Sequence, residues 1–189
     1  LINGISLGSI YAIIALGYTM VYGIAKMLNF AHGDVIMVGA YICFFSMSGL
    51  SGQFEEGSLA AAVVPAVAGT LAAMVVCTVL GIVIERLAYK PLRQAGSLAV
   101  LITAIGVSYF LQNAAQLLWS SSQKMFTPVI SRDLQLSLPG GLSISVLTIL
   151  TVCVCVVIMV ALMLFTGRTK MGKAMRAVSE DKGAALLMG

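Results

Sequence analysis

The chain has 189 residues, of which 60% are hydrophobic and only 10% are charged, and its formal net charge is +4. A soluble domain carries about 25% charged residues and a disordered chain is poor in apolar ones, so the mean hydropathy of +1.04 excludes both classes. The positive charge lies in short segments between apolar runs, and it therefore does not predict nucleic-acid binding.

Five runs of the sequence contain no charged residue, and each can supply most or all of one membrane-spanning helix. The runs are 1–25, 35–54, 57–84, 94–123 and 134–167. A β-barrel would instead show strands of about ten residues with alternating polarity, and that pattern is absent. The sequence predicts an all-α, polytopic transmembrane helical bundle with spans at about 2–24, 28–49, 59–84, 98–119 and 142–166.

The first span carries small and polar residues early in its length. Ser9 and Tyr11 can share one helical face with Gly8 beside them, and they are candidates for the lining of a polar route. Hydrogen bonding between helices is the alternative role, because small and polar side chains also join membrane helices. A cleaved signal peptide is excluded, since the run lacks a basic start and a cleavage site. The chain begins at Leu1 and not at methionine, so we expect a fragment of a longer protein.

The stretch MLNFAHGDVIM, residues 27–37, places Asn29, His32 and Asp34 among apolar residues. A second span that began only after Asp34 would be shorter than the roughly 30 Å hydrocarbon core, so we expect this stretch within the membrane or at its cytoplasmic edge. Gly33 permits irregular backbone, which at that depth must line a cavity or be buried in protein. Two interpretations stay open: a substrate-path or gating element, and a helix start capped by Asn29 or Asp34.

The third span, 59–84, contains Pro65, which can kink a membrane helix, and small residues at steps of four that suit close helix packing. The small residues are Gly69, Ala73, Cys77 and Gly81. The cysteines of the chain all lie in apolar runs without metal-ligand spacing, which predicts buried thiols and neither a metal site nor a cofactor. They are Cys43, Cys77, Cys153 and Cys155.

The fourth span and the segment after it carry the remaining outer features. Gln112 and Asn113 are amides near the outer end of this span and could extend a polar route. Leucines alternate with polar residues over 134–138, which predicts a short strand, and Pro-Gly-Gly at 139–141 predicts a turn. A small extracytoplasmic cap is therefore expected.

The charges of the connecting segments orient the bundle. Segments 85–97 and 167–189 contain most of the Lys and Arg residues, and the positive-inside rule assigns them to the cytoplasm. Alternation then assigns 50–58 and 120–141 to the outside. The segment 170–187 can form a helix with an apolar side, which is either a docking surface for a cytoplasmic partner or an ordinary solvated helix.

Enzyme chemistry finds no support in the sequence. GRTKMGKA, residues 167–174, has the spacing of a phosphate-binding loop, but Ala174 stands where Ser or Thr would bind Mg²⁺ and the segment follows a membrane span. One histidine and seven acidic residues, most of them at membrane edges, also form no catalytic set. We expect a protein that is not an enzyme and has no ATPase site of its own.

Several stretches together resemble one family. NGISLGSIYAIIALGYTMVYGIAKMLNFAHGDVIMVGAY resembles the start of the LivH-type permease of bacterial branched-chain amino acid ABC importers. IERLAYKPLR and LITAIGVSYFLQN look like its middle, and GRTKMGKAMRAVSEDKGAALLMG resembles its cytoplasmic loop. The resemblance covers nearly the whole chain in order, and NFAHGD is its most specific piece.

The resemblance implies a partial transmembrane permease domain over 1–189 in the bacterial cytoplasmic (inner) membrane, with 167–189 as the cytoplasmic coupling segment. It implies a LivM-type second permease, two cytoplasmic ATP-binding subunits and a periplasmic substrate-binding protein as partners. The stretch SEDKGAALLMG departs from the EAA loop of ABC importers, because it keeps Glu180 but lacks the alanines next to it. The residues that the resemblance offers for ATPase coupling are Gly172, Arg176, Glu180 and Asp181.

The expected mechanism is alternating access, in which ATP-driven movement of 170–187 rocks the bundle around a midplane cavity. Helix N-termini and small polar side chains could bind a zwitterionic substrate there. Three alternatives stay open. They are a urea or amide permease of the same family, an ion-coupled secondary transporter, which usually needs a carboxylate inside a span, and a membrane scaffold without transport.

Overall fold

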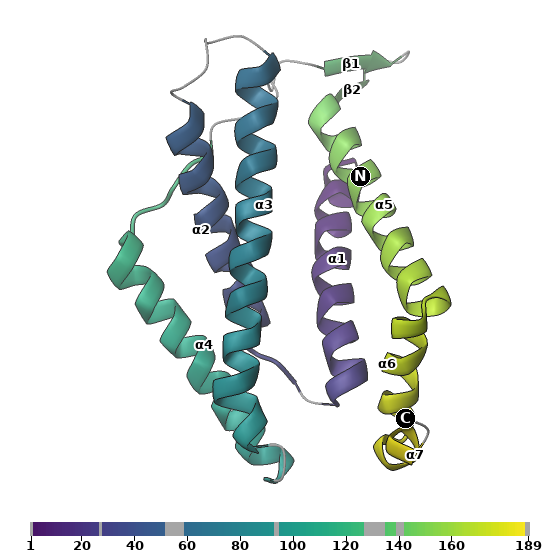
Figure 1. The fold of residues 1–189 in the computed structure, drawn as a ribbon. Helices are drawn as coiled ribbons and strands as arrows, with labels where there is room; N and C mark the ends of the chain where they lie inside the picture. Colours follow the sequence, from purple (N-terminus) through teal and green to yellow (C-terminus); the bar gives the residue numbers. More distant parts are fainter. Residues whose placement is uncertain are drawn as a thin grey trace. The chain divides into compact units, whose positions relative to one another are not determined.

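The structure is a computed structural model that describes residues 2–26, 28–51, 59–92, 95–126, 135–138 and 142–187. Its described part contains five helices that are long and apolar enough to cross a membrane. Figure 1 labels these helices on the ribbon. They are α1 (Ile2–Ala25), α2 (His32–Ser51), α3 (Leu59–Ile84), α4 (Ser97–Trp119) and α5 (Val146–Arg168). The predicted all-α, polytopic transmembrane class is confirmed, with one small hairpin added to it.

The chain divides into two compact units. Unit 1 comprises Leu1–Met27 and Ile130–Gly189, and unit 2 comprises Leu28–Val129. Unit 1 therefore contains α1, α5 and the elements around α5, while unit 2 contains α2, α3 and α4.

In unit 2, α2 and α3 lie side by side along most of their length (Figure 1). Two glycines permit this approach because their missing side chains leave room for the neighbouring helix. A Cβ built on Gly39 of α2 would lie 2.8 Å from Cys77 Sγ, and one built on Gly69 of α3 would lie 3.0 Å from both Cys43 O and Met47 Cγ. Within the small-residue pattern of α3, Gly69 and Cys77 therefore contact α2, whereas Gly81 has open space at its Cβ position.

Replacing Gly69 by alanine is expected to destabilise this helix pair by about 1–3 kcal/mol, as overpacking does in protein cores. The carbonyl of Cys43 is backbone and cannot rotate away from the new methyl group. Gly81→Ala on the same helix is the matched control, since nothing lies within 4 Å of its Cβ position. It should be neutral or stabilising by up to about 1 kcal/mol, because alanine favours helix. Thermal unfolding of the full-length protein in detergent measures both, and equal midpoints would contradict the close contact.

At its end α3 changes geometry. A π-helical turn, η1 (Glu85–Tyr89), follows Ile84, and a short 3-10 turn, η2 (Lys90–Leu92), follows η1. The backbone N–H of Lys90 donates to the carbonyl of Glu85, five residues back. Pro91 has no N–H, and in an α-helix its ring would meet the carbonyl four residues earlier, which favours a wider turn here.

The helix starts differ from the prediction at two places. The second span was expected from residue 28, but α2 begins at His32, because Asn29 forms a turn before it. The fifth was expected from residue 142, but Leu142–Ser145 forms strand β2, which pairs antiparallel with β1 (Gln135–Leu138). The predicted strand over 134–138 is thus confirmed for 135–138, while the predicted turn at 139–141 lies outside the described residues.

In unit 1, α1 packs along α5 and also contacts α6 (Lys170–Glu180). A single helix was expected over 170–187, but α7 (Lys182–Leu187) is separate. The break lies at Asp181, whose backbone is extended and whose Oδ1 accepts hydrogen bonds from the N–H groups of Gly183 and Ala184. An aspartate in this position caps the start of a new helix instead of continuing the old one.

The cysteines are all free, but not all are buried. Cys155 is buried, Cys43 and Cys77 are half-buried, and Cys153 is exposed. The prediction of a buried thiol is therefore wrong for Cys153, because residues two apart on α5 point to nearly opposite sides of the helix. Among the described residues no group of three metal-ligating side chains could hold an ion.

Candidate functional site

The candidate site in unit 2 centres on Asp34, which lies in the first turn of α2 and is only 8% exposed. Its carboxylate accepts hydrogen bonds from two side chains of α4. The hydroxyl of Ser108 donates to Oδ2, and the amide of Gln112 donates to Oδ1 at 3.0 Å. Such bonds offset the cost of taking a carboxylate out of water, and the helix N-terminus adds a favourable field.

The two donors come from one face of α4. Ser108 and Gln112 are four residues apart, which places them one helical turn from each other, and Gln112 also donates to the Ser108 hydroxyl at 3.2 Å. The adjacent amide, Asn113, instead donates to the carbonyl of Tyr109 in its own helix at 2.7 Å. We refer to Asp34, Ser108 and Gln112 as the Asp34 cluster. It joins α2 to α4, and the structure brings only Gln112 of the two predicted amides into it.

A second contact fixes the chain just before α2. Asn29 Oδ1 accepts hydrogen bonds from the backbone N–H of Ala31 at 3.1 Å and from the hydroxyl of Tyr89 at 2.7 Å. The Asn29 carbonyl accepts from the N–H of His32 at 3.2 Å. Ala31 is fully buried, packed in a small core with Ile84 of α3 and a leucine of α4. The Asn29 turn is therefore a capped helix start that is also tied to η1.

This geometry bears directly on the two interpretations of the MLNFAHGDVIM stretch. The backbone is irregular only before His32, and Gly33 is already helical, exposed and without a heavy atom within 4 Å of its Cβ position. Irregular backbone at Gly33 is therefore absent. His32 is half-buried in the same turn. The capping interpretation describes Asn29, whereas Asp34 reaches across to another helix, as a gating element would also require.

The predicted residues of the first span lie in unit 1 and do not form a comparable cluster. The Ser9 hydroxyl donates to the Ser6 carbonyl of its own helix at 2.7 Å. Tyr11 is 61% exposed, and Gly8 has open space at its Cβ position. These three residues line the surface of α1, and the structure assigns no shared contact to them among the described residues.

Two of the predicted coupling residues, Gly172 and Arg176, lie near the junction of α5 and α6 at Thr169. Gly172 is buried, and a Cβ on it would overlap the carbonyl oxygens of Phe165 and Thr166. Its N–H donates to the Thr169 hydroxyl at 3.0 Å, which caps α6. Arg176 donates from Nη2 to the Gly167 carbonyl at 3.0 Å. Both predicted residues therefore hold the position of α6 relative to α5.

The other two coupling residues have different surroundings. Asp181 caps α7, as described above, whereas Glu180 is exposed at the end of α6. Both side chains are exposed, and that of Asp181 is held by its two hydrogen bonds to α7.

Two residues of the site, Ser108 and Tyr89, were not among the predicted site residues. Ser108 stands four residues before Gln112, so the helical period places both on one face, and this signal could have found it. Tyr89 gave no signal, because its hydroxyl meets Asn29 only through the π-helical turn of η1.

The described residues contain five helices that are long and apolar enough to cross a membrane, which defines a multi-pass membrane protein. The family described as the permease component of the branched-chain amino acid transport system matches residues 1–189, and the chain belongs to this family.

Named relatives agree with the family. The chain is 41% identical over its whole length to the high-affinity branched-chain amino acid transport system permease protein BraD of Pseudomonas aeruginosa. It is 40% identical over 99% of its length to LivH of Escherichia coli strain K12 and 38% identical to LivH of Salmonella typhimurium. The chain spans about 60% of the length of these relatives. No solved structure matches it.

Proposed function

We propose that this chain forms membrane-spanning helices of a permease that imports branched-chain amino acids. The observation that carries the proposal is the family match over residues 1–189, together with relatives at 40–41% identity that are named as high-affinity branched-chain amino acid permease proteins. These relatives are named as transport system permease proteins. The energy for uptake would come from ATP-binding subunits, since we propose no ATPase site in this chain.

The proposed assembly contains a LivM-type second permease, two cytoplasmic ATP-binding subunits and a periplasmic substrate-binding protein. The junction of α5 and α6 supports a docking role for the α6–α7 segment, because Gly172 and Arg176 tie α6 to α5. Force applied to α6 would therefore reach a membrane span. Glu180 is exposed and suits a contact with a basic partner surface.

The proposed mechanism is alternating access, with the Asp34 cluster as a gating element. A zwitterionic substrate needs donors for its carboxylate and acceptors for its ammonium group. Gln112 is exposed, and because its two N–H groups donate to Asp34 and Ser108, its amide oxygen is the group that can accept from a substrate ammonium beside the fixed carboxylate. Asn29, His32 and Gly33 would position this helix start, and Gly8, Ser9, Tyr11 and Asn113 would line other parts of the substrate path.

Uptake of labelled leucine tests the function directly. We expect a host strain that lacks its own system to import leucine when it carries the full-length gene with its partner subunits. Uptake should fall to the level of the host strain when an ATP-binding subunit is deleted. Labelled urea and short amides belong in the same assay, and import of these instead of leucine would assign the chain to a urea or amide permease.

One observation favours a second function, an ion-coupled transporter. Asp34 is a buried carboxylate inside a candidate span, and such groups often bind the coupling ion. Uptake that persists without the ATP-binding subunits, and that is lost when a proton or sodium gradient is collapsed, would support this function. The same result would contradict the ATP-driven importer.

A further inference from the structure

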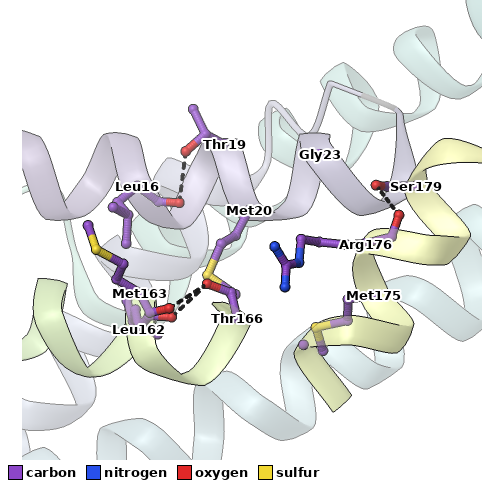
Figure 2. A pocket seen from close by; sticks show the side chains of 11 residues that line it. Leu16, Thr19, Met20, Gly23, Leu162, Met163, Thr166, Met175, Arg176 and Ser179 are labelled. Atoms are coloured by element: carbon purple, nitrogen blue, oxygen red, sulfur yellow. Dashed lines mark hydrogen bonds between the residues drawn. The ribbon is translucent and has the colours of Figure 1, made fainter. Parts of the chain in front are cut away.

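Unit 1 contains a cavity that the proposed transport function does not use. It has a volume of about 330 Å³ and lies where α1, α5 and α6 meet. Figure 2 shows its apolar wall, to which Leu16 and Met20 of α1 and Leu162 and Met163 of α5 contribute. This volume is at the lower end of the range for ligand pockets and suits part of an elongated apolar molecule.

The hydroxyl groups at the cavity donate their protons to their own helices. Thr19 donates to the Leu16 carbonyl at 3.0 Å, and Thr166 donates to the Leu162 carbonyl at 2.9 Å. Ser179 donates to the Arg176 carbonyl at 2.7 Å. These hydroxyls therefore offer little donor capacity to a ligand, and a different side chain must donate any hydrogen bond to it.

Arg176 supplies that donor. Figure 2 shows its guanidinium extending from α6 toward Met20 and Thr166. One nitrogen, Nη2, donates to the Gly167 carbonyl, while a guanidinium carries five donors in all. No Asp or Glu is present among the described residues that line the cavity. An apolar cavity with a cation at its wall complements a ligand that has an apolar chain and an anionic head.

The position of the cavity identifies the source of such a ligand. Its walls belong to two candidate membrane spans, α1 and α5, and Arg176 lies eight residues beyond the end of α5. The positive-inside rule places this basic end in the cytoplasm, where the membrane surface is rich in anionic lipid. Further lysines on the exposed side of α6, Lys170 and Lys173, add to the attraction.

We propose that this cavity binds an anionic phospholipid of the cytoplasmic leaflet. One acyl chain lies against the apolar wall formed by α1 and α5, and the phosphate accepts hydrogen bonds from the Arg176 guanidinium. Arg–phosphate contacts are frequently bidentate, and the planar guanidinium provides that geometry. The lipid would fill the space where α6 leaves the membrane and would stabilise α6 against α1 and α5.

The test uses the full-length permease in its transport complex, exchanged into bilayers of equal parts phosphatidylcholine and phosphatidylglycerol. Native mass spectrometry of the released complex counts the lipids that remain bound. We expect the wild type to retain phosphatidylglycerol in preference to phosphatidylcholine. Arg176→Gln should lower that retention at least about tenfold, since hydrogen bonds to charged groups are lost. Lys173→Gln removes an exposed charge from the same helix. It should lower phosphatidylglycerol retention by less than about fivefold, which is the effect of one basic residue near a membrane surface.

A second pair of variants separates loss of the site from disturbance of α6. Gly23 lines the cavity and has open space at its Cβ position, so Gly23→Leu fills the cavity while Arg176 keeps its bond to Gly167. Gly4→Leu on the same helix is the control. We expect Gly23→Leu to lower phosphatidylglycerol retention and Gly4→Leu to leave it unchanged. Equal retention of the two lipids by the wild type, or equal retention by Arg176→Gln and Lys173→Gln, would overturn the proposal, as would full retention in Gly23→Leu.

Discussion

Replacing Gly172 by alanine is expected to destabilise the junction of α5 and α6 by about 1–3 kcal/mol and to lower leucine uptake by at least about tenfold. The new methyl group would overlap the carbonyl oxygens of Phe165 and Thr166. Both atoms are backbone, so neither can rotate away, and α6 must move relative to α5. In the proposed importer this movement would separate the docking segment from the span that it drives. Uptake by full-length protein, with membrane expression measured in parallel, checks the result.

Gly167→Ala is the matched control for this substitution. Gly167 lies five residues earlier in the same junction, and nothing stands within 4 Å of its Cβ position. The Arg176 guanidinium donates to the backbone carbonyl of Gly167, which the substitution leaves in place, so this bond should survive. We expect near-normal uptake. If Gly167→Ala and Gly172→Ala reduced uptake equally, the effect would reflect helix propensity and not the carbonyl contact.

The second large effect is expected from Asp34→Ala. Removal of the buried carboxylate leaves the Ser108 hydroxyl and the Gln112 amide without their shared acceptor, which should cost about 1.5–3 kcal/mol in the stability of unit 2. Thermal unfolding of the full-length protein in detergent measures this cost. In a double-mutant cycle with Ser108→Ala, the two substitutions should be strongly non-additive, because the second removes an interaction that is already lost.

Asn113→Ala supplies the control for this cycle. Asn113 lies next to Gln112 on α4, but its amide bonds to the Tyr109 carbonyl of its own helix. Its effect should therefore add to that of Asp34→Ala within about 0.5 kcal/mol. Additivity for Ser108 as well would show that the Asp34 cluster contributes no coupling between α2 and α4.

Tyr89→Phe removes one hydrogen bond from Asn29 and should lower the stability of unit 2 by only about 1 kcal/mol.

The membrane helices could be predicted from the sequence because their signal is long and additive. A charge-free run of more than twenty residues has few other stable solutions, so α1, α3 and α4 begin and end close to the expected residues. The starts of α2 and α5 were displaced by four residues each, since they depend on local pairings. One is the hydrogen bond from Ala31 to Asn29, and the other is the pairing of β1 with β2.

The candidate site could be predicted only in part. The cost of a buried carboxylate singled out Asp34, and its burial agrees with that argument. The partners of Asp34 depend on which helix packs beside α2 and at what rotation. Gln112 and Asn113 differ by about 100° around α4, and nothing in their composition says which one faces α2. Tyr89 depends in addition on a π-helical turn, for which apolar periodicity contains no signal.

That π-helical turn changes which side of the helix the residues after α3 face. The hydrogen bond from Lys90 to Glu85 encloses one residue more than an α-helical turn does. Each residue rotates an α-helix by about 100°, so every position beyond η1 is offset by that angle from a wheel drawn through α3. The turn behaves as a single-residue insertion that the helix absorbs without breaking. A one-residue deletion between Glu85 and Tyr89 would restore the α-helical register and turn the basic end of this span toward a different neighbour.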